Sequence, residues 1–113
     1  MARLEGYRFG RVLVDGEEHT RDVIVLPGRT VAGWWRHDGH ALVRQDLDEV
    51  WNELPAHLVV GTGHDGRMRA DPEALDALRA RGIEVQVAPT AEAVRLFDQL
   101  DPAEAAAALH LTC

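Results

Sequence analysis

The N-terminal part of the chain carries apolar patterns that are typical of strands. Residues 7–14 are rich in β-branched and aromatic side chains and run into Asp15-Gly16, a pair that favours a tight hairpin, with residues 17–20 returning. Residues 23–26 form an uninterrupted apolar run that ends at a Pro-Gly pair, which predicts a strand buried on both faces. Residues 30–36 are predicted as a further strand.

Helical and strand patterns alternate along the rest of the chain. Asp46 and Glu49 resemble a capping box and predict a helix start, and four apolar residues that follow share one helical face: Leu47, Val50, Trp51 and Leu54. Residues 58–61 and 83–87 are predicted as strands. The order strand, helix, strand, helix implies right-handed crossovers onto a largely parallel sheet.

The boundaries of two later helices are marked by capping residues. Asp71 as the cap, Pro72 at the first helical position and Gly82 just past the end frame one helix. Thr90 is predicted to cap the next. Residues 105–113 are ambiguous, because the alanines favour a helix whereas the last four residues alternate as in a strand.

Length and charge limit the class of protein. The 113 residues fit one domain, residues 1–113, that buries a single core. A net charge of -7 disfavours nucleic acid and anionic membrane surfaces as partners. No apolar stretch approaches the roughly 20 residues that span a bilayer, so we expect no membrane insertion. The lone cysteine, Cys113, fits a reducing compartment, and we predict a cytoplasmic protein.

Two residue types are absent from the chain, and their absence excludes several chemistries. There is no lysine and no serine. A Walker-type phosphate loop needs its lysine, Schiff-base chemistry needs an amine, and a nucleophile-elbow hydrolase needs its serine. All three classes are therefore excluded.

A glycine-rich loop follows the apolar run at residues 58–60, with Gly61, Gly63 and Gly66 in the G-x-G-x-x-G spacing of dinucleotide sites. The helix that should follow at once begins only near residue 71, and the next strand does not end in the acid that binds a ribose. We therefore expect no dinucleotide and no other cofactor. The loop and the next helix start could instead hold a small anion, with these ligand-binding residues: Gly61, Thr62, Gly63, Arg67 and Thr90. A structural turn with a threonine cap is the simpler alternative.

Metal and catalytic chemistry have weaker sequence support. His37 with His40 and His110 with Cys113 could together form a His3Cys set, but structural zinc sites favour several cysteines and only one is present. His110 and Cys113, three apart in a strand, would point to opposite faces and could not form a dyad. We expect no metal site and assign no catalytic residue.

Adjacent tryptophans in a strand point to opposite faces, so Trp34 and Trp35 cannot enter the same layer. We expect the β layer to cover at least one of them, with the other near His40 and available to a partner. Trp34, Trp35 and His40 are the predicted partner surface.

Five segments in order resemble the Mth-type family of domains of unknown function, and the resemblance covers nearly the whole chain. They are Asp22-Val23-Ile24-Val25, Trp34-Trp35 with Gly39-His40, Gly61-Thr62-Gly63, Pro89-Thr90-Ala91-Glu92-Ala93 and His110-Leu111-Thr112-Cys113. That family looks to include an archaeal hypothetical protein, an adipogenesis-associated protein and an assembly factor of mitochondrial respiratory complex I. The resemblance implies a three-layer α/β fold with a mixed, mostly parallel central sheet and a smaller N-terminal β layer. It also implies a C-terminal strand and no established activity.

These observations together predict a soluble binding or assembly-accessory domain that acts through contacts with an unknown protein partner. A small polar pocket is expected at the glycine-rich loop. The alternative is a small enzyme or sensor that binds an anionic metabolite in that pocket. Fold alone does not decide between them.

Overall fold

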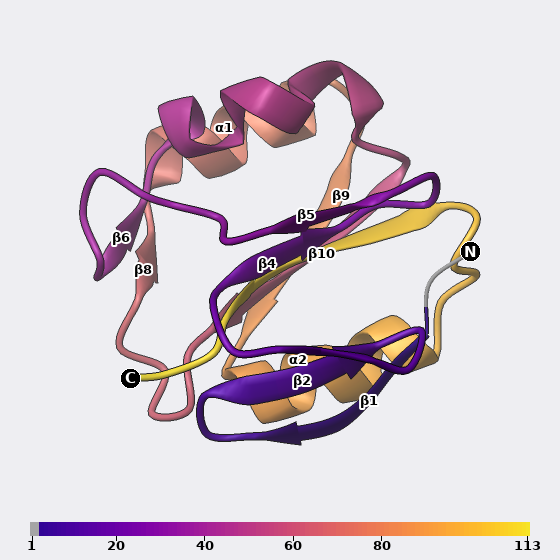
Figure 1. The fold of residues 1–113 in the computed structure, drawn as a ribbon. Helices are drawn as coiled ribbons and strands as arrows, with labels where there is room; N and C mark the ends of the chain where they lie inside the picture. The colour runs from indigo at the N-terminus through magenta and orange to yellow at the C-terminus, as the bar shows by residue number, and fades with distance from the viewer. Residues whose placement is uncertain (1–2) are drawn as a thin grey trace.

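The central sheet of the computed structural model, which describes residues 3–113, has five strands (Figure 1). Their order is β5 (Thr30–Ala32), β4 (Val23–Val25), β10 (Ala105–His110), β7 (His57–Thr62) and β9 (Glu84–Ala88). β10 is parallel to β7 and β7 to β9, whereas β4 is antiparallel to both of its neighbours. Every strand except β4 therefore points the same way, and the predicted mixed, mostly parallel sheet is confirmed.

Each face of this sheet is covered by a different layer. The 3-10 helix η1 (Arg44–Glu53) and α1 (Pro72–Ala80) cover one face. The other face is covered by α2 (Thr90–Asp98) and an antiparallel sheet of β1 (Leu4–Arg8), β2 (Arg11–Val14) and β3 (Glu17–His19). A short parallel pair, β6 (Ala41–Leu42) with β8 (Arg69–Ala70), lies beside the main sheet. The three layers and the smaller N-terminal β layer agree with the expected fold.

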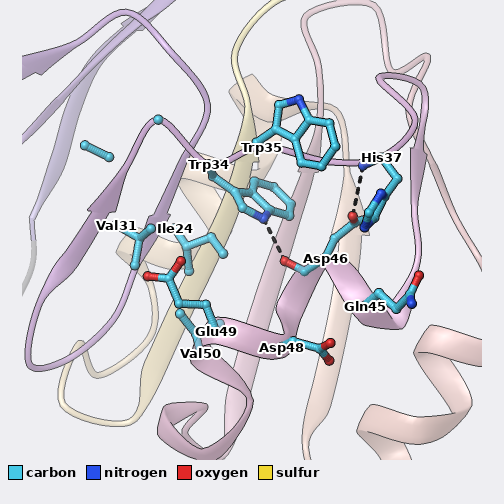
Figure 2. Close-up of a pocket in the computed structure, with 12 residues that line it drawn as sticks. Ile24, Val31, Trp34, Trp35, His37, Gln45, Asp46, Asp48, Glu49 and Val50 are labelled. Carbon is cyan, nitrogen blue, oxygen red and sulfur yellow. Dashed lines mark hydrogen bonds between the residues drawn. The ribbon is translucent and has the colours of Figure 1, made fainter.

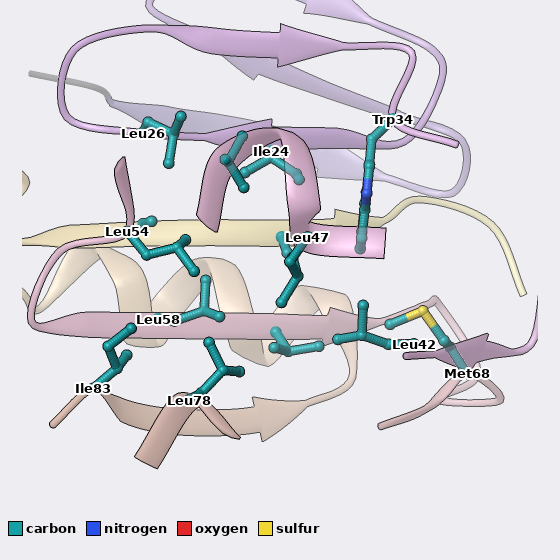
Figure 3. Close-up of a cluster of buried hydrophobic side chains, with 14 residues drawn as sticks. Ile24, Leu26, Trp34, Leu42, Leu47, Leu54, Leu58, Met68, Leu78 and Ile83 are labelled. Atoms are coloured by element: carbon teal, nitrogen blue, oxygen red, sulfur yellow. The ribbon is translucent and has the colours of Figure 1, made fainter. Parts of the chain in front are cut away.

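The C-terminal segment is a central strand despite its alanines. All six residues of β10 are buried, and the strand pairs with β4 on one side and β7 on the other. Ala106 and Ala108 belong to the core under η1 and α1, whereas Ala105 and Ala107 belong to the core under α2. Figure 3 shows the first of these cores, with Leu47 from η1 and Leu78 from α1. Small side chains on both faces let the covering layers approach closely, and ladder hydrogen bonds outweigh a modest helix propensity.

The predicted end of α1 is confirmed. Gly82 has φ +80°, its N–H donates to the Arg79 carbonyl at 2.9 Å, and the Ile83 N–H donates to the Leu78 carbonyl at 3.1 Å. This is the Schellman pattern, in which a left-handed residue closes the helix. Ile83 and Leu78 are buried in the same core, which supplies the expected apolar contact.

Two predicted elements in the N-terminal half need correction. Residues 7–14 are not one strand, because the chain reverses at Gly10, with φ +79°, before the predicted second turn at Asp15-Gly16. Strand β5 ends at Ala32 and not at residue 36, since Gly33 has φ +66° and turns the chain out of the sheet. Trp34 and Trp35 therefore lie on an irregular segment beyond the strand.

The first helical segment also differs from the prediction. It is a 3-10 helix that begins at Arg44 with Val43 as its N-cap. Asp46 is the third helical residue, and its carboxylate accepts a hydrogen bond from the Val43 N–H at 2.9 Å. Asp46 therefore serves as the acid of a capping interaction and not as the cap itself.

Candidate functional site

The glycine-rich loop lies at the carboxyl end of β7, but its polar groups are engaged within the chain. The Gly63 N–H donates to the Thr90 hydroxyl at 2.8 Å, and that hydroxyl donates to the His110 carbonyl at 2.5 Å. The Thr62 hydroxyl donates to the Ala88 carbonyl at 3.1 Å. Thr90 is fully buried and lies inside α2, so the prediction that it caps the helix is wrong.

The C-terminal residues fill the space in front of this loop. The His64 N–H donates to the Thr112 carbonyl at 2.6 Å, and the Arg67 N–H to the Cys113 carbonyl at 3.1 Å. A Cβ atom on Gly63 would lie 2.5 Å from the Cys113 backbone. The loop is thus packed against the chain's own carbonyl groups, and an anion would have to displace residues 112–113. The anion site stays a prediction.

The two tryptophans have opposite environments, as their adjacent positions predict. Trp34 is buried, and its indole N–H donates to the Asp46 carbonyl at 2.9 Å (Figure 2). Trp35 is 71% exposed, and its ring lies 5.0 Å from that of His37 in an edge-on contact. The cover over Trp34 is η1 and not the N-terminal β layer, so that part of the prediction is wrong.

Of the predicted partner surface, only Trp35 and His40 are exposed. The His40 backbone bonds to Asp38 and Arg69, in the turn that leads to β6. The ring in contact with Trp35 is that of His37, which the sequence did not single out for this surface.

A groove of about 440 Å³ runs between the tryptophan segment and η1 (Figure 2). Its polar and aromatic lining comes from Trp34, Trp35, His37, Gln45, Asp46, Asp48 and Glu49. Three of these side chains are carboxylates and none is an arginine. The groove therefore has an exposed indole, that of Trp35, on one side and acidic side chains of η1 on the other.

The three carboxylates of the groove differ in their partners. That of Asp46 accepts hydrogen bonds from the His37 N–H at 3.1 Å and the Val43 N–H, and so holds the two sides of the groove together. Asp48 forms an ion pair with Arg44 one turn earlier on η1. The Glu49 carboxylate is 3.7 Å from the Arg29 guanidinium.

The main partner of Arg29 is Glu53 and not Glu49, because Arg29 donates two hydrogen bonds to Glu53, at 2.9 and 2.7 Å. Glu49 is 69% exposed at its side chain and keeps most of its acceptor capacity. It is therefore the carboxylate most available to a ligand in the groove.

A buried ionic cluster lies behind the groove and was not predicted from the sequence. The Arg36 guanidinium donates to the Asp22 carboxylate at 2.7 Å and to the Gly39 carbonyl at 3.0 Å. His110 Nδ1 lies 2.7 Å from the same Asp22 oxygen and 3.1 Å from Arg36 Nη2. We assign the proton to Nδ1 from the shorter contact, because the carboxylate oxygen can only accept; Arg36 Nη2 then donates to the Gly39 carbonyl and not to the ring. These residues are far apart in the chain, so no spacing signal could have identified the cluster.

The charge on Asp22 is stabilised by its partners. Burial by itself raises the pKa of the Asp22 carboxyl, but hydrogen bonds from His110, from the Leu111 N–H and from Arg36, with the charge of Arg36, hold that pKa below its ordinary value. The Arg36 guanidinium also lies 4.8 Å from the centre of the Trp34 ring. The cluster thus fixes the tryptophan that forms the floor of the groove.

Within residues 3–113, no group of three or more histidine, cysteine or acidic side chains is placed to hold a metal ion. His110 is engaged by Asp22, whereas His37 and His40 are exposed between β5 and β6. The helices in this part of the chain are all too short or too polar to cross a membrane.

Comparisons with known proteins match this architecture over nearly its full length. Residues 4–110 match the model of the protein of unknown function family DUF498/DUF598. The conserved hypothetical protein PH1505 from Pyrococcus horikoshii OT3 is 30% identical, with 98% of this chain and 99% of that chain covered and a TM-score of 0.82.

Two more distant structures share the fold. The protein MT938 is 23% identical over the full length of both chains, with a TM-score of 0.79. A Mth938-like domain protein of Bordetella pertussis is 18% identical, with 97% of this chain and 85% of that chain covered and a TM-score of 0.76. The resemblance to Mth-type domains is thereby confirmed, and the chain belongs to the DUF498/DUF598 family of proteins of unknown function.

Proposed function

We propose that this protein is a binding or assembly-accessory domain that acts through contacts with another protein, centred on Trp35 and the adjacent groove. The observation that carries the proposal is the exposure of the Trp35 indole, at 71%, beside a groove of about 440 Å³. Tryptophan is enriched among the residues that dominate binding energy at protein interfaces, because it buries a large apolar area on binding.

The segment that carries Trp35 is anchored on both sides. Trp34 is bonded to the Asp46 carbonyl, and the Arg36 guanidinium is bonded to Asp22 and Gly39. The next residue, His37, donates its N–H to the Asp46 carboxylate. A backbone that is held on both sides of Trp35 loses little further conformational freedom when a partner binds, which favours affinity.

The alternative, a small enzyme or sensor for an anionic metabolite at the glycine-rich loop, has less support. Four of its proposed residues are buried, and the Gly63 amide and the Thr90 hydroxyl are already paired with each other. Of the five proposed residues, Arg67 alone has an exposed side chain. We place the binding function in the cytoplasm, since the single cysteine is suited to a reducing compartment.

Site-specific photocrosslinking in the producing cells tests the proposal. A photoreactive phenylalanine analogue replaces Trp35 in one variant and Phe9, which is 55% exposed on the N-terminal β layer, in the matched control. We expect a discrete crosslinked protein from position 35 and none from position 9. Equal products from both positions, or no product from position 35, would refute the proposed surface.

A further inference from the structure

We propose that the groove beside Trp35 receives an arginine side chain of the partner protein, with the guanidinium stacked on the Trp35 indole and paired with Glu49. This inference rests on the proposed function, since it names the chemistry by which the same surface would recognise its partner. The observation behind it is a difference among the three tryptophans in their contacts with guanidinium groups.

The other two tryptophans already stack against guanidinium groups of this chain. Arg36 Cζ lies 4.8 Å from the centre of the Trp34 ring, and Arg44 Cζ lies 4.1 Å from that of Trp51. In these two pairs the same arginine also binds a carboxylate, Asp22 for Arg36 and Asp48 for Arg44. A second guanidinium on Trp51, that of Arg81 at 5.4 Å, donates to the Trp51 carbonyl instead. The repeated unit is therefore a guanidinium placed between an indole and a carboxylate. In this arrangement the flat face of the guanidinium contacts the indole ring, and its N–H groups donate to the carboxylate.

The Trp35 indole lines a groove that also holds a carboxylate, but within residues 3–113 no arginine lies on its ring. Glu49 lines the same groove and keeps most of its acceptor capacity, because its neighbour Arg29 is bonded twice to Glu53. The groove is lined by three carboxylates and no arginine, in a chain of net charge -7. An arginine from another protein would complete the unit with charge complementarity.

Arginine fits this position better than an acidic or purely apolar side chain. An acidic group would be repelled by Asp48 and Glu49, and an apolar one would make no use of the free acceptor capacity of Glu49. The planar guanidinium can stack on the indole and donate to a carboxylate at the same time, which a lysine ammonium does less well.

Nuclear magnetic resonance titration with a short glycine-arginine peptide tests the inference on the whole chain. Binding of the peptide is measured by the chemical shift of the Trp35 indole N–H signal. The same peptide with citrulline in place of arginine is the neutral control. We expect saturable shifts with the arginine peptide in the millimolar range and none with the citrulline peptide. Glu49→Gln should weaken binding about three- to fivefold, the range of an exposed charge-assisted contact.

The matched control is Glu92→Gln, which removes one exposed carboxylate from α2 on the opposite face of the sheet and should leave the affinity unchanged. Equal weakening by both variants, equal binding of both peptides, or no Trp35 shift across the millimolar range would overturn the inference. Failure of the peptide titration while crosslinking from position 35 persists would overturn the arginine but keep the protein contact. Loss of position-specific crosslinking would remove the proposed function itself.

Discussion

The Thr90 hydroxyl and the Gly63 N–H are joined by a hydrogen bond of 2.8 Å across the carboxyl end of the central sheet. This bond occupies the Gly63 N–H, one of the amides that the glycine spacing suggested for binding an anion. It also places Gly63 directly under the C-terminal backbone, where a Cβ atom would lie 2.5 Å from Cys113. The loop is thus a packed junction of β7, α2 and the segment after β10.

Gly63→Ala is expected to lower the free energy of unfolding by more than about 2 kcal/mol, because a Cβ meets backbone and φ is +105°. Gly82→Ala is the matched control, since φ is +80° there but no atom lies within 4 Å of the new Cβ. That variant should lose about 1 kcal/mol. Urea unfolding of both variants measures the difference, and equal losses would contradict the packing at Gly63.

Thr90→Val should destabilise the protein by about 1–3 kcal/mol, because it leaves the Gly63 N–H and the His110 carbonyl buried without this partner. Thr90→Ser keeps the hydroxyl and loses one methyl group, so it should lose only about 1 kcal/mol. Thermal and urea unfolding of the pair separate the two effects. A serine variant as unstable as the valine variant would mean that packing, and not the hydrogen bonds, dominates at this position.

Asp46→Asn should lower stability by about 1–3 kcal/mol, because one of the two backbone N–H donors then faces an amide N–H₂ group. Asp48→Asn is its control on the same helix. Asp48 is exposed and pairs only at the surface, so its loss should stay within about 0.5 kcal/mol. Urea unfolding followed by circular dichroism measures the stability of both variants. An Asp46→Asn variant as stable as Asp48→Asn would show that the groove does not depend on this carboxylate.

Asp22 should make folding stability depend on pH in the acid range. Its folded pKa is lower than the pKa of an unfolded aspartate, so its contribution is fully present above the unfolded value and is lost as pH falls toward the folded value. Asp22→Asn removes this titration. The stability difference between the parent protein and Asp22→Asn should therefore be largest near neutral pH and shrink below about pH 4. A difference that is constant with pH, measured by urea unfolding, would show that the Asp22 charge is not stabilised by folding.

Features that depend on neighbours along the chain could be predicted from the sequence. The Asp15-Gly16 turn has both residues at positive φ, and α1 begins and ends where Asp71, Pro72 and Gly82 predict. The run at residues 23–26 is buried as expected. In each case the physical cause is local: a backbone conformation that few residues adopt, an orphan helix amide, or an apolar run too long for a surface.

Features that join distant segments depend on how the layers pack and could not be predicted in this way. Residues 105–110 form a strand because β4 and β7 offer hydrogen bonds on both sides, which outweigh the helix propensity of alanine. The glycine loop is closed by residues 112–113, and the Asp22 cluster draws on three separate parts of the chain. The exposure of Trp35 likewise follows from the turn at Gly33 and the position of η1. Such contacts are selected by the packing of whole layers, so the spacing of residues in one segment carries no signal for them.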